Sequence, residues 1–294
     1  TYSVAPILLP STLAQPPGCE CDVYGPNNAG QVVGFVYNGS FNVGPNFIAT
    51  TSGYTLLPLP AHTIATALNN FGQVTGSFDF GLSSIGQQPQ AFIGSTAGYT
   101  LIPLPPGATA TTGIALNDPS QVGGEASAPN TGAPSFPFIG TSSNTVTIPP
   151  PPGWNPNLEL QGINNSGEVV GEGYRSTDSN SIAPYVGTTS GSMPISLPPG
   201  WITISAVFRI NDSGEVAGYG NNGGVYQSFV STPAATTALL MLSGASACYV
   251  SLGHDKAIND SGALWVIATL VVHESGTSVM ASSPSITSFR PVAH

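Results

Sequence analysis

Two carboxylates occupy positions where they could form a catalytic pair for hydrolysis. Glu125 and Glu172 each follow a glycine, and they occupy equivalent points of two neighbouring repeats of the sequence. Glycoside hydrolysis requires two carboxyl groups about 5 to 10 Å apart across a cleft. The surrounding residues do not distinguish this pair from ordinary strand positions, so we expect both side chains to be structural.

Histidine, a frequent catalytic base, is scarce. The four histidines are dispersed along the chain: His62, His254, His273 and His294. His254 is followed by Asp255 and Lys256, and we interpret this cluster as a local ion pair. The sequence contains neither a G-x-S-x-G nucleophile elbow nor a His-x-x-x-His metal pair. It therefore predicts no catalytic residue, no metal ligand and a protein that is not an enzyme.

Asn/Asp/Gly tetrads recur along the chain and look like fragments of calcium-binding loops. A calcium ion takes about six to eight oxygen ligands, whereas each tetrad offers two side chains that could supply them. Asn and Asp also begin tight turns, and Gly supplies the positive φ that such turns need. We therefore interpret the tetrads as turns and expect no cofactor, with calcium as the less favoured alternative.

Two tryptophans, Trp154 and Trp201, follow equivalent Pro-Pro-Gly turns. Exposed rings at these points could stack on sugars, which would make the pair a weak candidate for a carbohydrate-binding site with polysaccharide as the partner. The favoured interpretation is that the two rings cover hydrophobic junctions between repeats.

Three cysteines allow one disulfide. Cys19 and Cys21 lie in the connection that leads into the first repeat, and Cys248 lies in the connection that leads into the sixth. If the chain closes into a ring, these connections are neighbours, and a bond between Cys248 and either of the other two would join the ends. In a secreted protein, the remaining thiol could pair with another molecule.

One motif, roughly N-[ND]-x-G-[QE]-V-x-G, sets the position of most of these residues. It occupies residues 27–34, 69–76, 117–124, 164–171, 211–218 and, in degenerate form, 259–266. The copies follow one another at spacings of 42 to 48 residues, which is too regular for chance. The chain therefore consists of six repeats of about 47 residues.

Each repeat predicts four short strands. In the second repeat, an apolar stretch at 66–68 precedes the turn, an alternating strand follows it, Phe92 begins a third strand and Tyr99 begins a fourth. A variable loop is expected between the second and third strands, at 79–90 in this repeat and at 174–183 in the fourth. A proline-rich turn then leads to the next repeat.

Four antiparallel strands in a repeat of this length are typical of a β-propeller blade. The sequence thus predicts an all-β, six-bladed β-propeller that forms a single domain over residues 1–294. Residues 1–10 and 285–292 both resemble the fourth strand and compete for the last blade. One of them either closes the ring or pairs with a neighbouring molecule, in a head-to-tail contact that can propagate into a fibre.

The stretch Ile-Asn-Asp-Ser-Gly-Glu-Val-Ala-Gly at 210–218 resembles the HAF repeats of bacterial secreted proteins. The opening Thr1–Val4 is also similar to the start of such mature proteins, as expected after removal of a signal peptide. The resemblance covers nearly the whole chain, in five good copies and one poor copy. It departs from the family where the Trp of the usual Ala-Phe-x-Trp strand is replaced by Gly, Ala or Ser. It implies an extracellular setting and no particular reaction.

The composition excludes several classes of partner. Charged residues make up 6% of the chain, against about 25% in a typical domain, and the net charge is −10 with four basic residues. Nucleic acids and anionic membranes need clustered cations, so neither is expected to bind. No apolar run reaches the roughly 18 residues of a spanning helix, so we expect no membrane insertion.

These observations favour a non-enzymatic structural or assembly protein of the cell exterior, such as a subunit of a filament, sheath or matrix that contacts copies of itself. The alternative is an extracellular, lectin-like propeller module that binds carbohydrate. A glycan-active enzyme is the least favoured interpretation.

Overall fold

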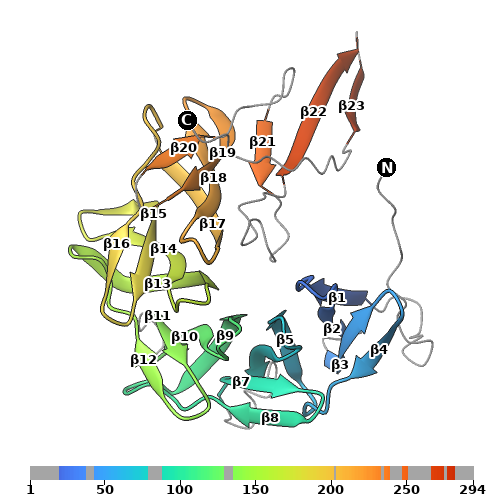
Figure 1. Ribbon diagram of the computed structural model, residues 1–294. Helices are drawn as coiled ribbons and strands as arrows, with labels where there is room; N and C mark the ends of the chain where they lie inside the picture. Colours follow the sequence, from blue (N-terminus) through green and yellow to red (C-terminus); the bar gives the residue numbers. More distant parts are fainter. Residues whose placement is uncertain are drawn as a thin grey trace. The chain divides into compact units, whose positions relative to one another are not determined.

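Figure 1 shows the computed structural model, which describes residues 20–37, 43–78, 88–128, 135–201, 203–232, 235–238, 247–250, 266–274 and 277–281. These residues form antiparallel β-strands joined by turns. The chain divides into two compact units, Thr1–Ile148 and Pro149–His294. Within the described ranges, no helix is long and apolar enough to cross a membrane.

Three four-stranded sheets make up the described part of the first unit, and in each the strands pair in chain order. Sheet 1 consists of β1 (Glu20–Tyr24), β2 (Val32–Tyr37), β3 (Val43–Thr50) and β4 (Gly53–Leu56). Sheet 2 consists of β5 (Thr63–Leu68), β6 (Val74–Phe78), β7 (Gln90–Ser95) and β8 (Gly98–Leu101). Sheet 3 consists of β9 (Ala110–Leu116), β10 (Val122–Ser127), β11 (Phe136–Gly140) and β12 (Thr145–Thr147).

The second unit continues the same pattern. Sheet 4 consists of β13 (Trp154–Ile163), β14 (Val169–Arg175), β15 (Asp178–Thr188) and β16 (Gly191–Pro194). Sheet 5 consists of β17 (Thr203–Ile210), β18 (Val216–Asn222), β19 (Val225–Ser231) and β20 (Thr236–Ala238). A further sheet of three described strands contains β21 (Ala247–Val250), β22 (Val266–Glu274) and β23 (Thr277–Ala281).

The predicted all-β fold, with four antiparallel strands in a repeat, is confirmed in sheets 1 to 5. Six blades and a single domain over 1–294 stay predictions. The sixth tetrad and the two competing terminal segments, 1–10 and 285–292, lie outside the described residues. The loop expected at 174–183 is wrong in part, because β14 extends to Arg175 and β15 already begins at Asp178. The polar residues at the exposed end of this hairpin favoured a loop in the sequence, although the chain forms strands there.

The glycine that ends a motif copy makes room for the aromatic residue of the third strand at Gly34, Gly124, Gly171 and Gly218. The five aromatic side chains are at most 1% exposed: Phe47, Phe92, Phe138, Tyr185 and Phe229. Each lies opposite the motif glycine in the strand register, as Phe138 does with Gly124. A Cβ atom on Gly124 would lie 2.7 Å from the Phe138 ring. Only glycine fits at this point without displacing the ring.

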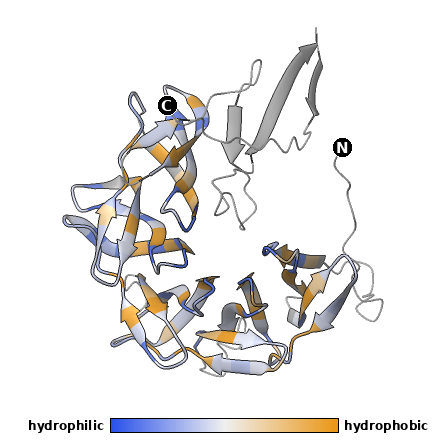
Figure 2. Ribbon diagram, in the orientation of Figure 1, coloured by the Kyte–Doolittle hydropathy of each residue, from blue (hydrophilic) through white to orange (hydrophobic). Residues whose placement is uncertain are grey.

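Apolar clusters join neighbouring sheets within each unit. In the first unit, Ile48 and Leu57 of the sheet 1 repeat pack with Leu68, Val74 and Phe92 of sheet 2. Similar clusters join sheet 2 to sheet 3 and sheet 4 to sheet 5. Figure 2 shows hydrophobic segments on the strands of each of these sheets and hydrophilic residues at the turns. Burial of these side chains holds each sheet against the next one.

Candidate functional site

The turn asparagines, which begin each motif copy, are buried residues that hold the turn together. They are Asn27, Asn69, Asn117, Asn164 and Asn211. In Asn69, the Oδ1 atom accepts hydrogen bonds from the backbone N–H groups of Phe71 and Gln73, both at 3.0 Å. Its Nδ2 atom donates to Gln73 Oε1 at 2.6 Å. The Gln or Glu at the fifth motif position therefore completes the turn.

Three of these asparagines also connect their turn to the turn of the next sheet of the same unit. Asn27 Nδ2 donates to the backbone carbonyl of Asn69 at 2.9 Å, and Asn69 Nδ2 donates to that of Asn117 at 3.1 Å. In the second unit, Asn164 Nδ2 donates to the carbonyl of Asn211 at 3.1 Å. Within each unit, these bonds form a ladder that runs from sheet to sheet.

The residue at the second motif position makes a further set of hydrogen bonds between neighbouring turns. The backbone N–H of Asn70 donates to Asp118 Oδ1 at 2.9 Å, and its Nδ2 atom donates to Asp118 Oδ2 at 2.8 Å. Asn165 and Asp212 make the same two bonds, both at 2.7 Å, in the second unit. The tetrads are therefore turns whose oxygens accept protein hydrogen bonds. In the described residues, no group of three or more His, Cys, Asp or Glu side chains could hold a metal ion.

Glu172, one of the two carboxylates considered for catalysis, is 7% exposed. Its Oε1 atom accepts a hydrogen bond from the backbone N–H of Val207 in the next sheet, at 2.6 Å. In the first unit, Asn46 Oδ1 accepts the equivalent N–H, that of Ala65, at 2.8 Å. A neutral amide thus does in one repeat what the carboxylate does in another, which indicates a structural role for Glu172.

Burial raises the pKa of Glu172 to about 7, although the hydrogen bond from Val207 opposes this rise. The nearby charge of Glu159 adds a smaller increase to the pKa. Glu125, the other carboxylate considered for catalysis, lies in the first unit, and its Oε2 atom accepts a hydrogen bond from Ser135 Oγ at 3.2 Å.

Trp154 and Trp201 are buried, with exposed fractions of 8% and 7%. Trp154 meets the Tyr185 ring edge-on at 6.4 Å between centroids, and Trp201 meets the Phe229 ring in the same way at 5.9 Å. Trp201 also belongs to the apolar cluster that joins sheets 4 and 5. The position of Trp201 agrees with the interpretation that its ring covers a junction, whereas Trp154 packs against Tyr185 of its own sheet. Both rings leave little surface for a sugar.

The other residues singled out from the sequence are mostly beyond the described part of the chain. Cys21 is half-buried on β1 and packs against a small apolar cluster of sheet 1. Cys19 and the side chain of Cys248 lie outside the described residues, so the disulfide stays a prediction. His254 to Lys256 also lie outside them. His62 stands in the turn before β5, with a positive φ of 62°.

A pocket of about 620 Å³ lies in the first unit, between sheets 2 and 3. Its walls come from β7, β8 and the turn between them, from the tetrad turns before β6 and β10, and from the turn between β11 and β12. Its lining residues include Gln73, Ser95, Tyr99, Ser120 and Ser142. Sequence reasoning missed this site, although one signal was present: the third tetrad carries Ser120 where the four other described tetrads carry glycine.

The fourth strands, β4, β8, β12, β16 and β20, each have one edge that no strand of their own sheet covers. None of these strands contains a charged residue. Large apolar side chains are nevertheless exposed on them: Tyr54, Leu56, Tyr99, Leu101, Val146 and Met193. These edges are therefore uncharged and partly hydrophobic.

No protein-family model matches the sequence, and no curated protein matches it. Among solved structures, the chain is similar to the β-propeller domain of the Trilobed protease from Pyrococcus furiosus, which has an open velcro topology. That likeness has a TM-score of 0.51 and 9% identity, over 90% of this chain and 83% of the other. It shows the fold, and the predicted β-propeller class is confirmed at this level.

The chain also matches a mutant of the Aleuria aurantia lectin AAL, solved in complex with Fucα1-6GlcNAc. This match has a TM-score of 0.42 and 8% identity, over 91% of this chain and 97% of the lectin. A likeness at this level carries no argument about what this chain binds.

Proposed function

We propose that the protein is a non-enzymatic structural subunit of the cell exterior, a β-propeller that assembles with copies of itself into a filament, sheath or matrix. The fourth strands carry this proposal. A free strand edge offers N–H and C=O groups to another strand, and proteins usually protect such edges with charged residues. Here, Leu56 is 47% exposed and Met193 is 70% exposed on strands without charge.

The segments that follow these strands support self-association as well. Residues 53–61, 98–108, 145–153 and 191–200 contain no Asp, Glu, Lys or Arg. Copies of the chain can therefore approach along these segments without bringing like charges together, despite the net charge of −10. The partner that we propose is a second copy of the chain, because that copy carries the same uncharged, apolar edges.

The ladder of turn asparagines supports a mechanical role. It joins successive sheets through buried hydrogen bonds, so that a load on one sheet is shared with the next. The acidic side chains at the fifth motif position, Glu168 and Glu215, accept bonds from these asparagines at 2.7 Å. Those carboxylates serve the scaffold, which is consistent with a protein without catalytic function. The HAF-like repeats support the extracellular setting.

Light scattering over a concentration series tests the proposal. We expect the purified chain to form particles whose mass exceeds the 29.8 kDa of one copy and grows with concentration. The double variant Leu56→Lys/Met193→Lys places a charge on two of the free edges, and we expect it to shift the mass toward one copy.

The matched control is Phe71→Lys, which makes a similar apolar-to-charged change at a residue that is 75% exposed in a turn. This variant is expected to assemble like the original chain. A mass of 29.8 kDa at every concentration, or equal dissociation by the control, would contradict assembly through the fourth strands.

A further inference from the structure

An open pocket between sheets 2 and 3 has a volume typical of small-ligand sites. It shares Tyr99 and Thr100 with β8, one of the fourth strands proposed above to pair between copies. Its volume of about 620 Å³ falls in the range of small-molecule sites, which is roughly 300 to 1,000 Å³. None of its lining residues is charged. Apart from Ile93 and Pro119, the lining residues are hydroxyl-bearing, amide or small, which favours a neutral and polar ligand.

Several of the hydroxyl groups are available to a ligand. In the described part of the chain, no side-chain hydrogen bond is made by the hydroxyls of Tyr99, Thr100 or Ser142, all of which are exposed. The Ser95 hydroxyl accepts one bond, from the backbone N–H of Ala97 at 3.1 Å. Each hydroxyl can both donate and accept, so the group matches a ligand that carries hydroxyls of its own.

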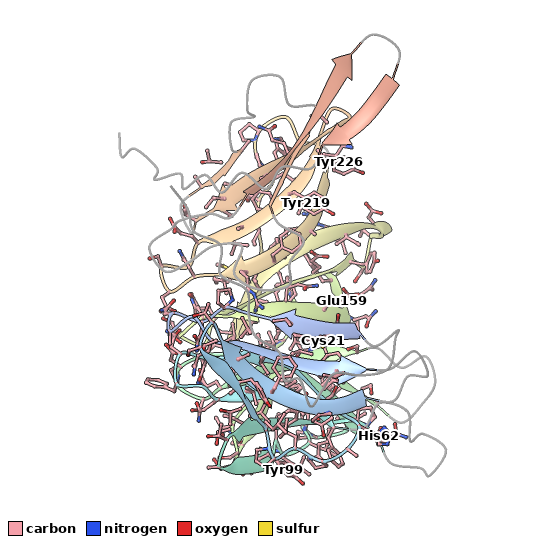
Figure 3. All side chains as sticks on the ribbon, turned by 90° about the vertical axis from the view of Figure 1, so that its right-hand side faces the viewer. Cys21, His62, Tyr99, Glu159, Tyr219 and Tyr226 are labelled. Atoms are coloured by element: carbon pink, nitrogen blue, oxygen red, sulfur yellow. The ribbon has the colours of Figure 1, made fainter. Side chains whose placement is uncertain are left out.

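Tyr99 provides the apolar surface of the site. It lies on β8, at the lower margin of the view in Figure 3, and it is 42% exposed. A tyrosine ring offers an apolar face beside a polar hydroxyl. A sugar ring has the complementary pattern, with C–H groups on one face and hydroxyls at its rim.

Ser120 marks this pocket as different from the equivalent places in the other repeats. It holds a φ of 65°, in a turn position that is occupied by Gly30, Gly72, Gly167 and Gly214 elsewhere. A residue other than glycine is strained in that conformation, and such strain is concentrated at functional sites. The Ser120 hydroxyl donates to Gln73 Oε1 at 2.7 Å, which fixes both polar side chains on the wall of the pocket.

We propose that this pocket binds a neutral sugar residue of a polysaccharide. Tyr99 lies against the C–H face of the sugar, the hydroxyls of Thr100 and Ser142 donate to and accept from the hydroxyls of the sugar, and the Ser120 oxygen, whose proton is donated to Gln73, accepts from one of them. Uronic acids and other anionic sugars are disfavoured, because no cation lines the pocket and the chain carries a net charge of −10. The site is distinct from Trp154 and Trp201, whose rings are buried.

The test is a titration of the full chain with neutral oligomers of glucose, galactose, mannose and xylose, and with galacturonate oligomers as the anionic counterpart. Ligand-observed NMR and calorimetry report the binding. We expect at least one neutral oligomer to saturate the protein, and we expect the galacturonate oligomers to bind more weakly. Absence of saturation by every neutral oligomer, or tighter binding of galacturonate, would overturn the proposal.

Point variants test whether the sugar binds in this pocket. Tyr99→Ala is expected to weaken sugar binding by about tenfold or more, since an aromatic surface is lost. Ser120→Gly should weaken sugar binding by about threefold through the loss of one hydroxyl. This variant is expected to fold, because glycine occupies the equivalent turn position in the other repeats. The matched control is Tyr54→Ala, which removes the equivalent tyrosine of the identical Gly-Tyr-Thr-Leu strand β4, at 39% exposure.

The control is expected to bind like the original chain. Equal weakening by Tyr54→Ala and Tyr99→Ala would place the sugar on the fourth strands in general and overturn the pocket assignment. The outcome is separable from the assembly proposal, because Leu56→Lys/Met193→Lys changes the mass of the particles and leaves the lining of the pocket intact.

Discussion

Replacement of Asn69 by alanine measures how much the turn ladder stabilises the protein. Asn69 is 4% exposed, and its side chain makes four hydrogen bonds. Two of them close its own turn through the N–H groups of Phe71 and Gln73, one holds the Gln73 side chain, and one reaches the carbonyl of Asn117 in the next sheet. Alanine removes all four bonds at once.

The expected loss of stability follows from the number of bonds. Each hydrogen bond contributes about 0.5 to 1.5 kcal/mol net, so four bonds give about 2 to 6 kcal/mol, and we expect about 4 kcal/mol. The matched control is Asn70→Ala at the next position. Its side chain makes two bonds, with Asp118 and with the N–H of Asn28, at a more exposed place. The same range gives about 1 to 3 kcal/mol for two bonds, and we expect about 1 to 2 kcal/mol because they are more exposed.

Urea unfolding, followed by circular dichroism, gives the free energy of unfolding of both variants and of the original chain. The ladder predicts a loss in Asn69→Ala that is at least twice the loss in Asn70→Ala. Equal losses would refute the reasoning, because the buried and cross-sheet bonds of the first asparagine would then have no special weight.

Three further changes are predicted from the structure. Gly218→Ala should cost about 2 to 3 kcal/mol in an unfolding titration, because the new Cβ atom would lie 2.7 Å from the Phe229 ring; an unchanged midpoint would contradict this packing. Glu172→Gln should remove a pH dependence of stability. The folded pKa of Glu172, about 7, lies above the ordinary value of 4.5. The contribution of this carboxyl group to the free energy of unfolding is therefore fully present below pH 4.5 and is lost as the pH rises through 7, by about 3 kcal/mol in all. A flat stability profile of the original chain over that window would contradict the buried carboxyl. Trp201→Ala should lower the free energy of unfolding by about 3 to 5 kcal/mol and leave sugar binding unchanged; weaker sugar binding in a folded variant would place the ligand at the tryptophan instead.

Much of the fold was predictable because the motif records local geometry. The positive φ of Gly72 and the close approach of the Ile64 backbone to Gly76 each demand glycine, so the repeated turn and strand positions are visible in the sequence. The strands on either side follow from alternating apolar residues. The hairpin of β14 and β15 was only partly predicted, because exposed polar residues such as Asp178 resemble a loop.

The sites were less predictable, because burial and side-chain proximity depend on packing between repeats. For Trp201, the sequence favoured a ring that covers a junction and left sugar stacking open, and only the contact with Phe229 shows that the ring is buried. The pocket brings Tyr99 of one repeat beside Ser120 of the next. No spacing rule along the chain reveals this pair, although Ser120 at a glycine position was a visible departure from the motif.

Hydrogen–deuterium exchange of the backbone amides, compared between dilute and concentrated protein, tests the central claim most directly. Amides of a free strand edge exchange readily, and pairing with a second copy protects them. Assembly through the fourth strands predicts slower exchange at 53–56, 98–101 and 191–194 in concentrated protein, with no change at the tetrad turns. Identical exchange at both concentrations, or protection elsewhere only, would contradict the account.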